Sequence, residues 1–205
     1  QYGPLAVNAT GTLEQPLVRL RAARPGLGVE LTDLEAELRG VPAGYQIRAS
    51  GKTAYGPLSG DVLVRNGAGP LAIDIRKATF AGIDFGGSIV QTKAGPFAGR
   101  LTLAGSGLNG GVVLSAAGAN QRADIDVAAN AAQISGTVPI TIGAGVVRAQ
   151  ATVYPDGPAI TGRFSLADVR QGETLIDKAQ GRIDYRGGRG TVAIVDPALR
   201  LVDQR

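Results

Sequence analysis

The feature that most constrains this chain is an alternation of apolar and polar residues with a period of two. It recurs from the first tenth of the sequence to the last, and is clearest where Val147, Ala149, Ala151 and Val153 alternate with polar residues. Successive side chains of a β-strand point to opposite faces of the sheet. Each such segment is therefore predicted to be a strand with one aliphatic face and one face in contact with water.

Short turn sequences separate the alternating segments. They are rich in glycine, proline and asparagine, as in Asn66-Gly67 and Pro155-Asp156-Gly157. Parallel strands would need long crossover connections, which the sequence lacks. We therefore expect an all-β fold of about fourteen antiparallel strands, in one continuous segment over residues 1–205.

One segment allows two interpretations. Leu27, Leu31, Leu34 and Leu38 recur at helical spacing, with acidic residues between them. An amphipathic helix and a bulged strand both fit this pattern. The sequence leaves the choice open.

The residue types that are absent exclude several kinds of chemistry. The chain has no Cys, Met, Trp or His. It therefore lacks the groups for a Ser-His-Asp triad, a thiolate nucleophile, a His/Cys zinc site or a disulfide framework. We expect no enzyme activity, no catalytic residue, no metal and no cofactor. Because the initiator methionine is also missing, we expect the sequence to be an excised segment or a processed chain.

The charge is mild and spread along the chain. The net charge is +4, and the basic residues are scattered rather than clustered. Nucleic-acid-binding proteins usually concentrate their positive charge in a patch, so no nucleic-acid partner is expected. Five arginines in the last third could meet phosphate groups, although a solvated surface also explains them. They are Arg148, Arg163, Arg182, Arg186 and Arg189.

Two other motifs have ordinary explanations. The sequence from Gly105 to Gly110 matches a dinucleotide-binding fingerprint, but a strand-like segment follows it where that fingerprint needs a helix. A glycine-rich hairpin is the better interpretation.

Asp124 and Asp126 share one face of a predicted strand, which suits a solvated face better than acid–base chemistry.

A Gly-Pro unit recurs before three predicted strands. It begins at Gly56, Gly95 and Gly157, at irregular intervals. This suits an extended, repetitive β structure.

The alternation also predicts the wall of an apolar surface, which could be the core of a closed sandwich or a trough in an open, U-shaped sheet. For a trough, the candidate lipid-binding groove consists of inward-facing residues: Ile73, Ile75, Leu101, Leu103, Ile125, Val127, Val138, Ile140, Ile142, Val147, Val153, Phe164, Leu166 and Ile183.

Several short motifs resemble the TamB family, which belongs with the AsmA-like proteins of Gram-negative envelopes. These motifs are Ala9-Thr10-Gly11-Thr12-Leu13, Pro16-Leu17-Val18-Arg19-Leu20, Leu31-Thr32-Asp33-Leu34, the Gly-Pro-Leu unit at Gly56, and Gly162-Arg163-Phe164-Ser165-Leu166. The resemblance covers most of the chain.

The resemblance implies a fold and a function. The body of such proteins is an elongated, curved antiparallel sheet folded along its length into a hydrophobic half-pipe, the β-taco. The family implies a periplasmic segment of an inner-membrane-anchored protein, with membrane contact made by parts outside this segment. The expected partners are phospholipid acyl chains and an outer-membrane barrel of the TamA type. The implied function is phospholipid transport between the inner and outer membranes, outer-membrane protein assembly, or both. On this resemblance, residues 27–38 would be a strand.

Other functions remain open. A structural or adhesive secreted β-solenoid would show a more regular repeat than the Gly-Pro unit gives. An outer-membrane barrel would carry aromatic girdles, whereas aromatic residues make up 4% of this chain. A glycan-active enzyme or a compact binding module are further alternatives.

Overall fold

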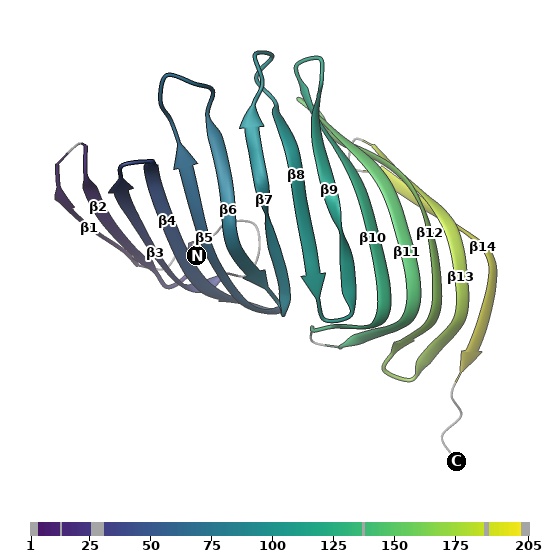
Figure 1. Ribbon diagram of the computed structural model, residues 1–205. Helices are drawn as coiled ribbons and strands as arrows, with labels where there is room; N and C mark the ends of the chain where they lie inside the picture. Colours follow the sequence, from purple (N-terminus) through teal and green to yellow (C-terminus); the bar gives the residue numbers. More distant parts are fainter. Residues whose placement is uncertain (1–3, 13, 26–30, 137, 187–188, 202–205) are drawn as a thin grey trace.

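The computed structural model of the chain is a single antiparallel β-sheet of fourteen strands (Figure 1). It describes residues 4–12, 14–25, 31–136, 138–186 and 189–201. The strands are β1 (Leu5–Gly11), β2 (Pro16–Ala22), β3 (Thr32–Val41), β4 (Gly44–Thr53), β5 (Gly56–Arg65), β6 (Ala72–Phe80), β7 (Ile83–Gln91), β8 (Phe97–Gly105), β9 (Leu108–Ala117), β10 (Asn120–Ile134), β11 (Ile140–Tyr154), β12 (Gly157–Gln171), β13 (Thr174–Arg186) and β14 (Arg189–Leu201).

The sheet is a meander in which every strand pairs with its neighbour in sequence. The spatial order is the sequence order, from β1 to β14. β1 pairs only with β2 and β14 only with β13 among the described residues, so the sheet is open at both edges. The predicted all-β class and antiparallel meander are confirmed.

The ambiguous leucine segment is a bulged strand over the part that the structure describes. β3 begins at Thr32, and the register with β4 shifts between Thr32 and Glu35. Asp33 lies at this shift with a φ of 53°. Residues 26–30, including Leu27, lie outside the described residues. The helical alternative is therefore wrong over β3.

The Gly-Pro units mark the beginnings of strands. β5 begins at Gly56, β12 begins at Gly157, and β8 begins at Phe97, two residues after Gly95. The fingerprint-like sequence from Gly105 to Gly110 turns β8 into β9, and another strand follows it. The hairpin interpretation of this sequence is confirmed.

The longer strands of the second half continue past the end of the β8–β9 hairpin. The Asn130 amide donates to the Gly107 carbonyl, and the Gln133 amide donates to the Ser106 carbonyl. Ala131, between these two contacts, has a φ of 48°. Figure 1 shows β10 and β11 changing direction near their joining hairpin, so these strands do not stay in the plane of the shorter ones.

The sheet is one layer, and few apolar side chains are fully enclosed. No large side chain of the described residues is less than 2% exposed. The buried apolar residues are Ala22, Leu31, Leu63, Ala72, Ala132 and Ala179. The described residues include no helix of the length and apolarity needed to span a membrane. Stability in such a sheet comes from strand pairing and from side chains packed on each face.

Candidate functional site

One face of the sheet is apolar across all fourteen strands. Residues that lie directly opposite each other on paired strands share a face. The register therefore joins them into rows that cross the sheet. One row consists of Ala9, Val18, Leu38, Ile47, Val62, Ile75, Gly87, Leu101, Val112, Ile125, Ala149, Gly162, Ile183 and Val192.

A second row lies two residues further along each strand on the same face, except on β6, where a register shift between Ile75 and Ala78 makes the step three residues. It consists of Val7, Leu20, Ala36, Ala49, Gly60, Ala78, Phe85, Leu103, Gly110, Val127, Val147, Phe164, Gly181 and Ile194. Neither row contains a polar side chain. We call the side of the sheet that carries these two rows the apolar face.

Most of the predicted groove residues lie on the apolar face. Eight belong to the two rows: Ile75, Leu101, Leu103, Ile125, Val127, Val147, Phe164 and Ile183. Ile73, Val153 and Leu166 extend the same face. Ile73 and Leu166 each lie two residues along their strand from a row member, and Val153 lies four residues from Ala149. The pattern-based prediction therefore gathers these residues on one surface.

The other three predicted groove residues lie apart from the rows. Val138 is in the loop between β10 and β11 and is 49% exposed. Ile140 and Ile142 lie on β11 beyond Gly143, where the phase of the alternation changes. There Ile142 pairs with Ala132 on one side and Val169 on the other. These three residues are part of the turned end of the sheet.

Two pairs of adjacent valines show the contrast between the faces. Val112 and Val147 belong to the apolar rows and are half-buried. Their neighbours Val113 and Val146 point to the opposite face and are 42% and 37% exposed. The apolar rows are not evenly covered, since their members Val7, Val192 and Ile194 at the edge strands are 57%, 61% and 51% exposed.

The opposite face, which we call the polar face, carries cross-strand ion pairs. In its N-terminal half, one row of charged residues crosses β2 to β6, and each residue lies opposite the next on the neighbouring strand. The row consists of Arg19, Glu37, Arg48, Asp61 and Lys77. Arg19 Nε is 3.0 Å from a Glu37 carboxylate oxygen, and Arg48 Nε is 3.1 Å from one of Asp61. We call this row the charge ladder.

These hydrogen bonds lower the pKa values of several carboxyl groups on the polar face. The Arg19 side chain is the main cause for Glu37, and the Gln46 amide is the main cause for Asp61. Each donor stabilises the ionised carboxylate, so protonation requires a lower pH than usual.

Two further carboxyl groups follow the same rule. The Ser88 hydroxyl lowers the pKa of Asp74 by donating a hydrogen bond of 2.6 Å. Arg122 lowers the pKa of Asp124, and the same contact raises the pKa of Arg122. These carboxyl groups therefore stay ionised to a lower pH than unpaired carboxyl groups do.

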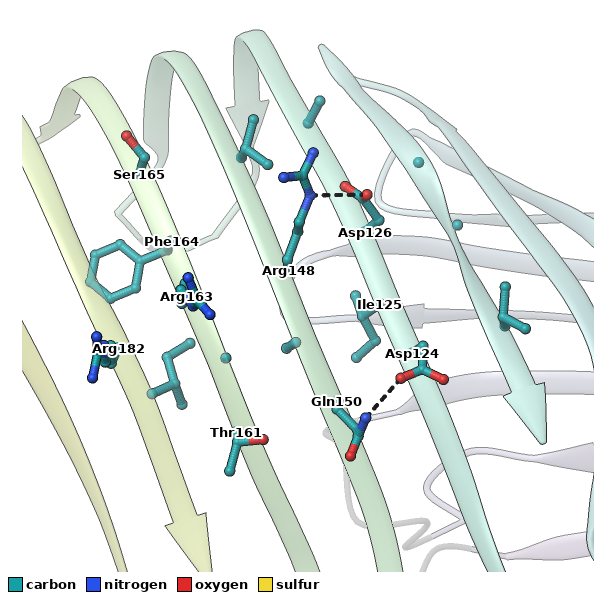
Figure 2. A pocket seen from close by; sticks show the side chains of 18 of the residues that line it. Asp124, Ile125, Asp126, Arg148, Gln150, Thr161, Arg163, Phe164, Ser165 and Arg182 are labelled. Atoms are coloured by element: carbon teal, nitrogen blue, oxygen red, sulfur yellow. Dashed lines mark hydrogen bonds and ion pairs between the residues drawn. The ribbon is translucent and has the colours of Figure 1, made fainter. Parts of the chain in front are cut away.

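Two hollows of the described chain lie on the polar face. The smaller, of about 370 Å³, lies over the charge ladder near Arg19, Glu37 and Arg48. The larger, of about 1670 Å³, lies over β8 to β13 (Figure 2). Its charged lining consists of Arg100, Arg148, Arg163, Arg182, Asp124, Asp126 and Asp184.

The larger hollow brings together three of the five arginines that the sequence singled out. Arg148, Arg163 and Arg182 lie directly opposite one another on β11, β12 and β13. Arg186 instead lies over the Tyr154 ring, with 5.9 Å between its Cζ and the ring centroid. Arg189 lies opposite Arg186 at the start of β14. No pattern along the chain predicts this grouping, because it depends on the register of two hairpins.

The paired aspartates of β10 have structural partners. Arg148 Nε lies 3.1 Å from an Asp126 carboxylate oxygen, and Arg122 and Gln150 donate to Asp124. Among the described residues, no group of three acidic, histidine or cysteine side chains could hold a metal ion. The apolar rows on one face suit contact with apolar chains, and the arginines of the larger hollow on the other face suit contact with anions.

No protein-family model, curated protein or solved structure matches the chain.

Proposed function

We propose that this chain is a lipid-handling surface whose apolar face holds the acyl chains of phospholipids. The protein would act as a binding and transport element and not as an enzyme. The observation that carries this proposal is the apolar face, which crosses all fourteen strands without a polar side chain in its two rows.

The size of this surface needs an explanation. Thirteen steps between strands of about 4.8 Å make a row of roughly 60 Å, about twice the hydrocarbon thickness of a bilayer. No second layer of the described chain packs on it, since the strand contacts join sequence neighbours. Soluble monomers rarely expose contiguous apolar patches larger than a few hundred Å². A ligand or partner that covers this face is therefore expected.

Acyl chains fit the chemistry of the face. Removing one CH₂ group from water contributes about 0.8 kcal/mol, so a long acyl chain gains much of its binding energy from burial alone. The rows contain Val, Ile, Leu, Ala, Gly and Phe, which offer no hydrogen bonds. Such a wall would hold a chain without fixing it at one point, which suits movement along the surface.

The finer parts of the proposal rest on the resemblance to the TamB family. We propose that the sheet folds lengthwise into a half-pipe with the apolar face inside. Val112 and Val147 are half-buried on that side, although no second layer of the described chain covers it.

The same resemblance supplies the cellular setting. The segment would lie in the periplasm of a Gram-negative cell, in a longer protein anchored in the inner membrane. It would carry phospholipid toward the outer membrane, take part in outer-membrane protein assembly with a TamA-type partner, or do both.

The adjacent valines provide a matched test. A photoreactive amino acid is placed at Val147 in one variant and at Val146 in another. Each purified protein is irradiated with vesicles that contain radiolabelled phospholipid, and the label on the protein is read on a gel. We expect label at position 147 and little at 146, because only the first side chain belongs to the apolar face.

Two other outcomes would contradict the proposal. Equal label at both positions would mean that lipid contacts the apolar face and the polar face equally. A protein–protein crosslink at 147, with no lipid label, would mean that another chain covers the apolar face. Transfer of a fluorescent phospholipid between vesicles, compared for Val147→Asp and Val146→Asp, then separates holding lipid from moving it.

A further inference from the structure

The polar face has two halves with different charge patterns. In the charge ladder, the signs alternate from strand to strand through Arg19, Glu37, Arg48, Asp61 and Lys77. Opposite charges that face each other across strands stabilise a sheet, and like charges directly opposite destabilise it. The N-terminal half follows this rule at each step of the ladder.

The C-terminal half departs from the rule where Arg186 lies opposite Arg189, and again on β11 to β13. Asp126 lies opposite Arg148, but Arg148 lies opposite Arg163, and Arg163 lies opposite Arg182. We call Arg148, Arg163 and Arg182 the arginine row. The Arg148 guanidinium is held by Asp126 at 3.1 Å. Within the described chain, Arg163 and Arg182 make no ion pair or hydrogen bond. Two adjacent positive charges are therefore left without compensation.

The arginine row lies in the larger hollow of the polar face. Figure 2 shows the three arginines on three successive strands, with Arg148 turned toward Asp126. Thr161 and Ser165, two residues on either side of Arg163 along β12, add hydroxyl groups to the lining. Asp184 is the nearby acid without a described partner, and it lies opposite Thr161. The hollow combines cationic and neutral hydrogen-bond donors.

We propose that Arg163 and Arg182 bind a phosphate group between them. Neighbouring strands are about 4.8 Å apart, so two opposed arginines can approach one phosphate from both sides. A guanidinium presents its N–H groups in a planar fork that matches phosphate oxygens, which favours two-point contacts. The bound phosphate supplies the negative charge that the row lacks. Arg148 is the third cation of the site, at the end held by Asp126.

This site is separate from the acyl-chain surface. The arginine row and the apolar rows lie on opposite faces of the same strands. Phosphate binding at the arginine row therefore does not depend on whether the apolar face holds acyl chains. The phosphate could belong to a soluble phosphate compound or to a lipid head group at a membrane surface, and the experiment below distinguishes these sources.

The first measurement is a titration of the arginine-labelled protein with inorganic phosphate. The Nε–Hε signals of the arginines are followed by NMR at constant ionic strength. We expect the signals of Arg163 and Arg182 to shift with saturation, and Arg163→Gln/Arg182→Gln to weaken binding by about tenfold or more. The control is Arg19→Gln/Arg48→Gln, which removes the same charge from the charge ladder and should change the affinity by less than about twofold.

Two further variants separate a shaped site from general charge. Arg163→Lys/Arg182→Lys keeps the charge but removes the planar forks, so most of the binding should be lost. Asp184→Asn removes the neighbouring carboxylate and should strengthen binding. Circular dichroism should show an unchanged sheet for each variant, because Arg163, Arg182 and Asp184 are exposed.

The second measurement identifies the source of the phosphate. The protein is sedimented with vesicles of phosphatidylcholine alone and with vesicles that also contain phosphatidylglycerol. Binding to anionic vesicles that depends on Arg163 and Arg182 would assign the site to lipid head groups. Binding of inorganic phosphate without vesicle binding would assign it to soluble phosphate compounds. Absence of both, or equal loss in the charge-ladder control, would overturn the proposal.

Discussion

At the scale of single residues, the position of a side chain along its strand decides which environment it meets. Val146 and Val147 are identical and adjacent, yet one is exposed on the polar face and the other is half-buried in an apolar row. Polar residues obey the same geometry. Asp61 and Asp74 meet donors on the polar face because neighbouring strands place Gln46 and Ser88 within 2.8 Å and 2.6 Å of their carboxylate oxygens.

These carboxylates predict how stability depends on pH. Their pKa values are lowered in the folded protein, chiefly by the Gln46 amide for Asp61 and the Ser88 hydroxyl for Asp74. The unfolded chain therefore binds more protons than the folded one as the pH falls through the ordinary value of 3.8. The contribution of Asp61 and Asp74 to the free energy of unfolding is therefore present above that pH. It is lost as the pH falls through the lowered pKa values of the folded protein. The chain has no histidine, so no side-chain titration of that type affects stability between about pH 5 and 8.

The urea midpoint of unfolding, measured from pH 8 to pH 2.5, checks this prediction. We expect a flat region down to about pH 5 and a fall below about pH 4. The variant Asp61→Asn/Asp74→Asn should have a lower urea midpoint at neutral pH, and its midpoint should decrease less steeply as the pH is lowered. A midpoint that stays constant to pH 2.5, or an unchanged slope in the variant, would contradict the assigned role of these hydrogen bonds.

At the scale of elements, short turns set the register and the longer strands turn at defined points. The β8–β9 hairpin ends against β10, which donates backbone hydrogen bonds to Ser106 and Gly107. This contact leaves no room for a side chain at Gly107. A Cβ atom on Gly107 would lie 2.5 Å from the Cα of Ala132 and 2.6 Å from the Ala131 carbonyl oxygen. The turn and the bend of β10 are therefore coupled by close backbone packing.

Two turn glycines provide a test of this coupling. Gly107 and Gly118 have φ values of +77° and +64°, so alanine is strained at both positions. A Cβ atom on Gly118 would meet nothing within 4 Å, whereas one on Gly107 would collide with β10. We expect Gly118→Ala to lower the free energy of unfolding by about 1 kcal/mol. Gly107→Ala should cost about 1–3 kcal/mol more, because it also overpacks the contact with β10.

Chemical denaturation of both variants gives the comparison. The backbone strain is common to the two substitutions, so their difference reports the close approach of β10. Equal losses of stability would show that the β8–β9 turn does not restrict β10 in solution.

At the scale of the whole molecule, the sheet behaves as a nearly one-dimensional array. Strand-to-strand contacts follow the sequence order from β1 to β14. In repeat-like arrays, stability is approximately a sum of local terms and interfaces between neighbours. The two edges have one neighbour each among the described strands, and Leu5 and Val192 near these edges are 63% and 61% exposed. Opening from the ends should therefore require less free energy than opening in the middle.

Hydrogen exchange of the backbone amides tests this expectation. We expect protection to be greatest in β9 to β12 and to decrease stepwise toward β1 and β14, because each opening from an edge breaks only one strand interface. Adding phospholipid vesicles should raise protection most on strands whose apolar face is occupied. Uniform protection across all fourteen strands would indicate one cooperative unit and would contradict the array description.

Much of this architecture was predictable because it depends on local order along the chain. The alternation in β11, for example, already assigns Val147 and Val153 to one face, since successive residues of any strand point to opposite sides. The leucine segment shows the limit of this reasoning. A bulge at Asp33 changes the phase of β3, so that Leu31 and Leu34, three residues apart, imitate helical spacing.

The alternation along the chain is enough to predict the all-β class, the approximate number of strands and the composition of each strand face. The neighbour of each residue on the next strand depends instead on how the strands pair in the folded sheet. Arg148, Arg163 and Arg182 are far apart in the chain, and they form a row because two hairpins fix their register. Likewise, Ile140 and Ile142 alternate as a strand should, but the turned end of β10 and β11 separates them from the apolar rows. Alternation is a property of one strand, whereas a row requires the registers of several strands to agree.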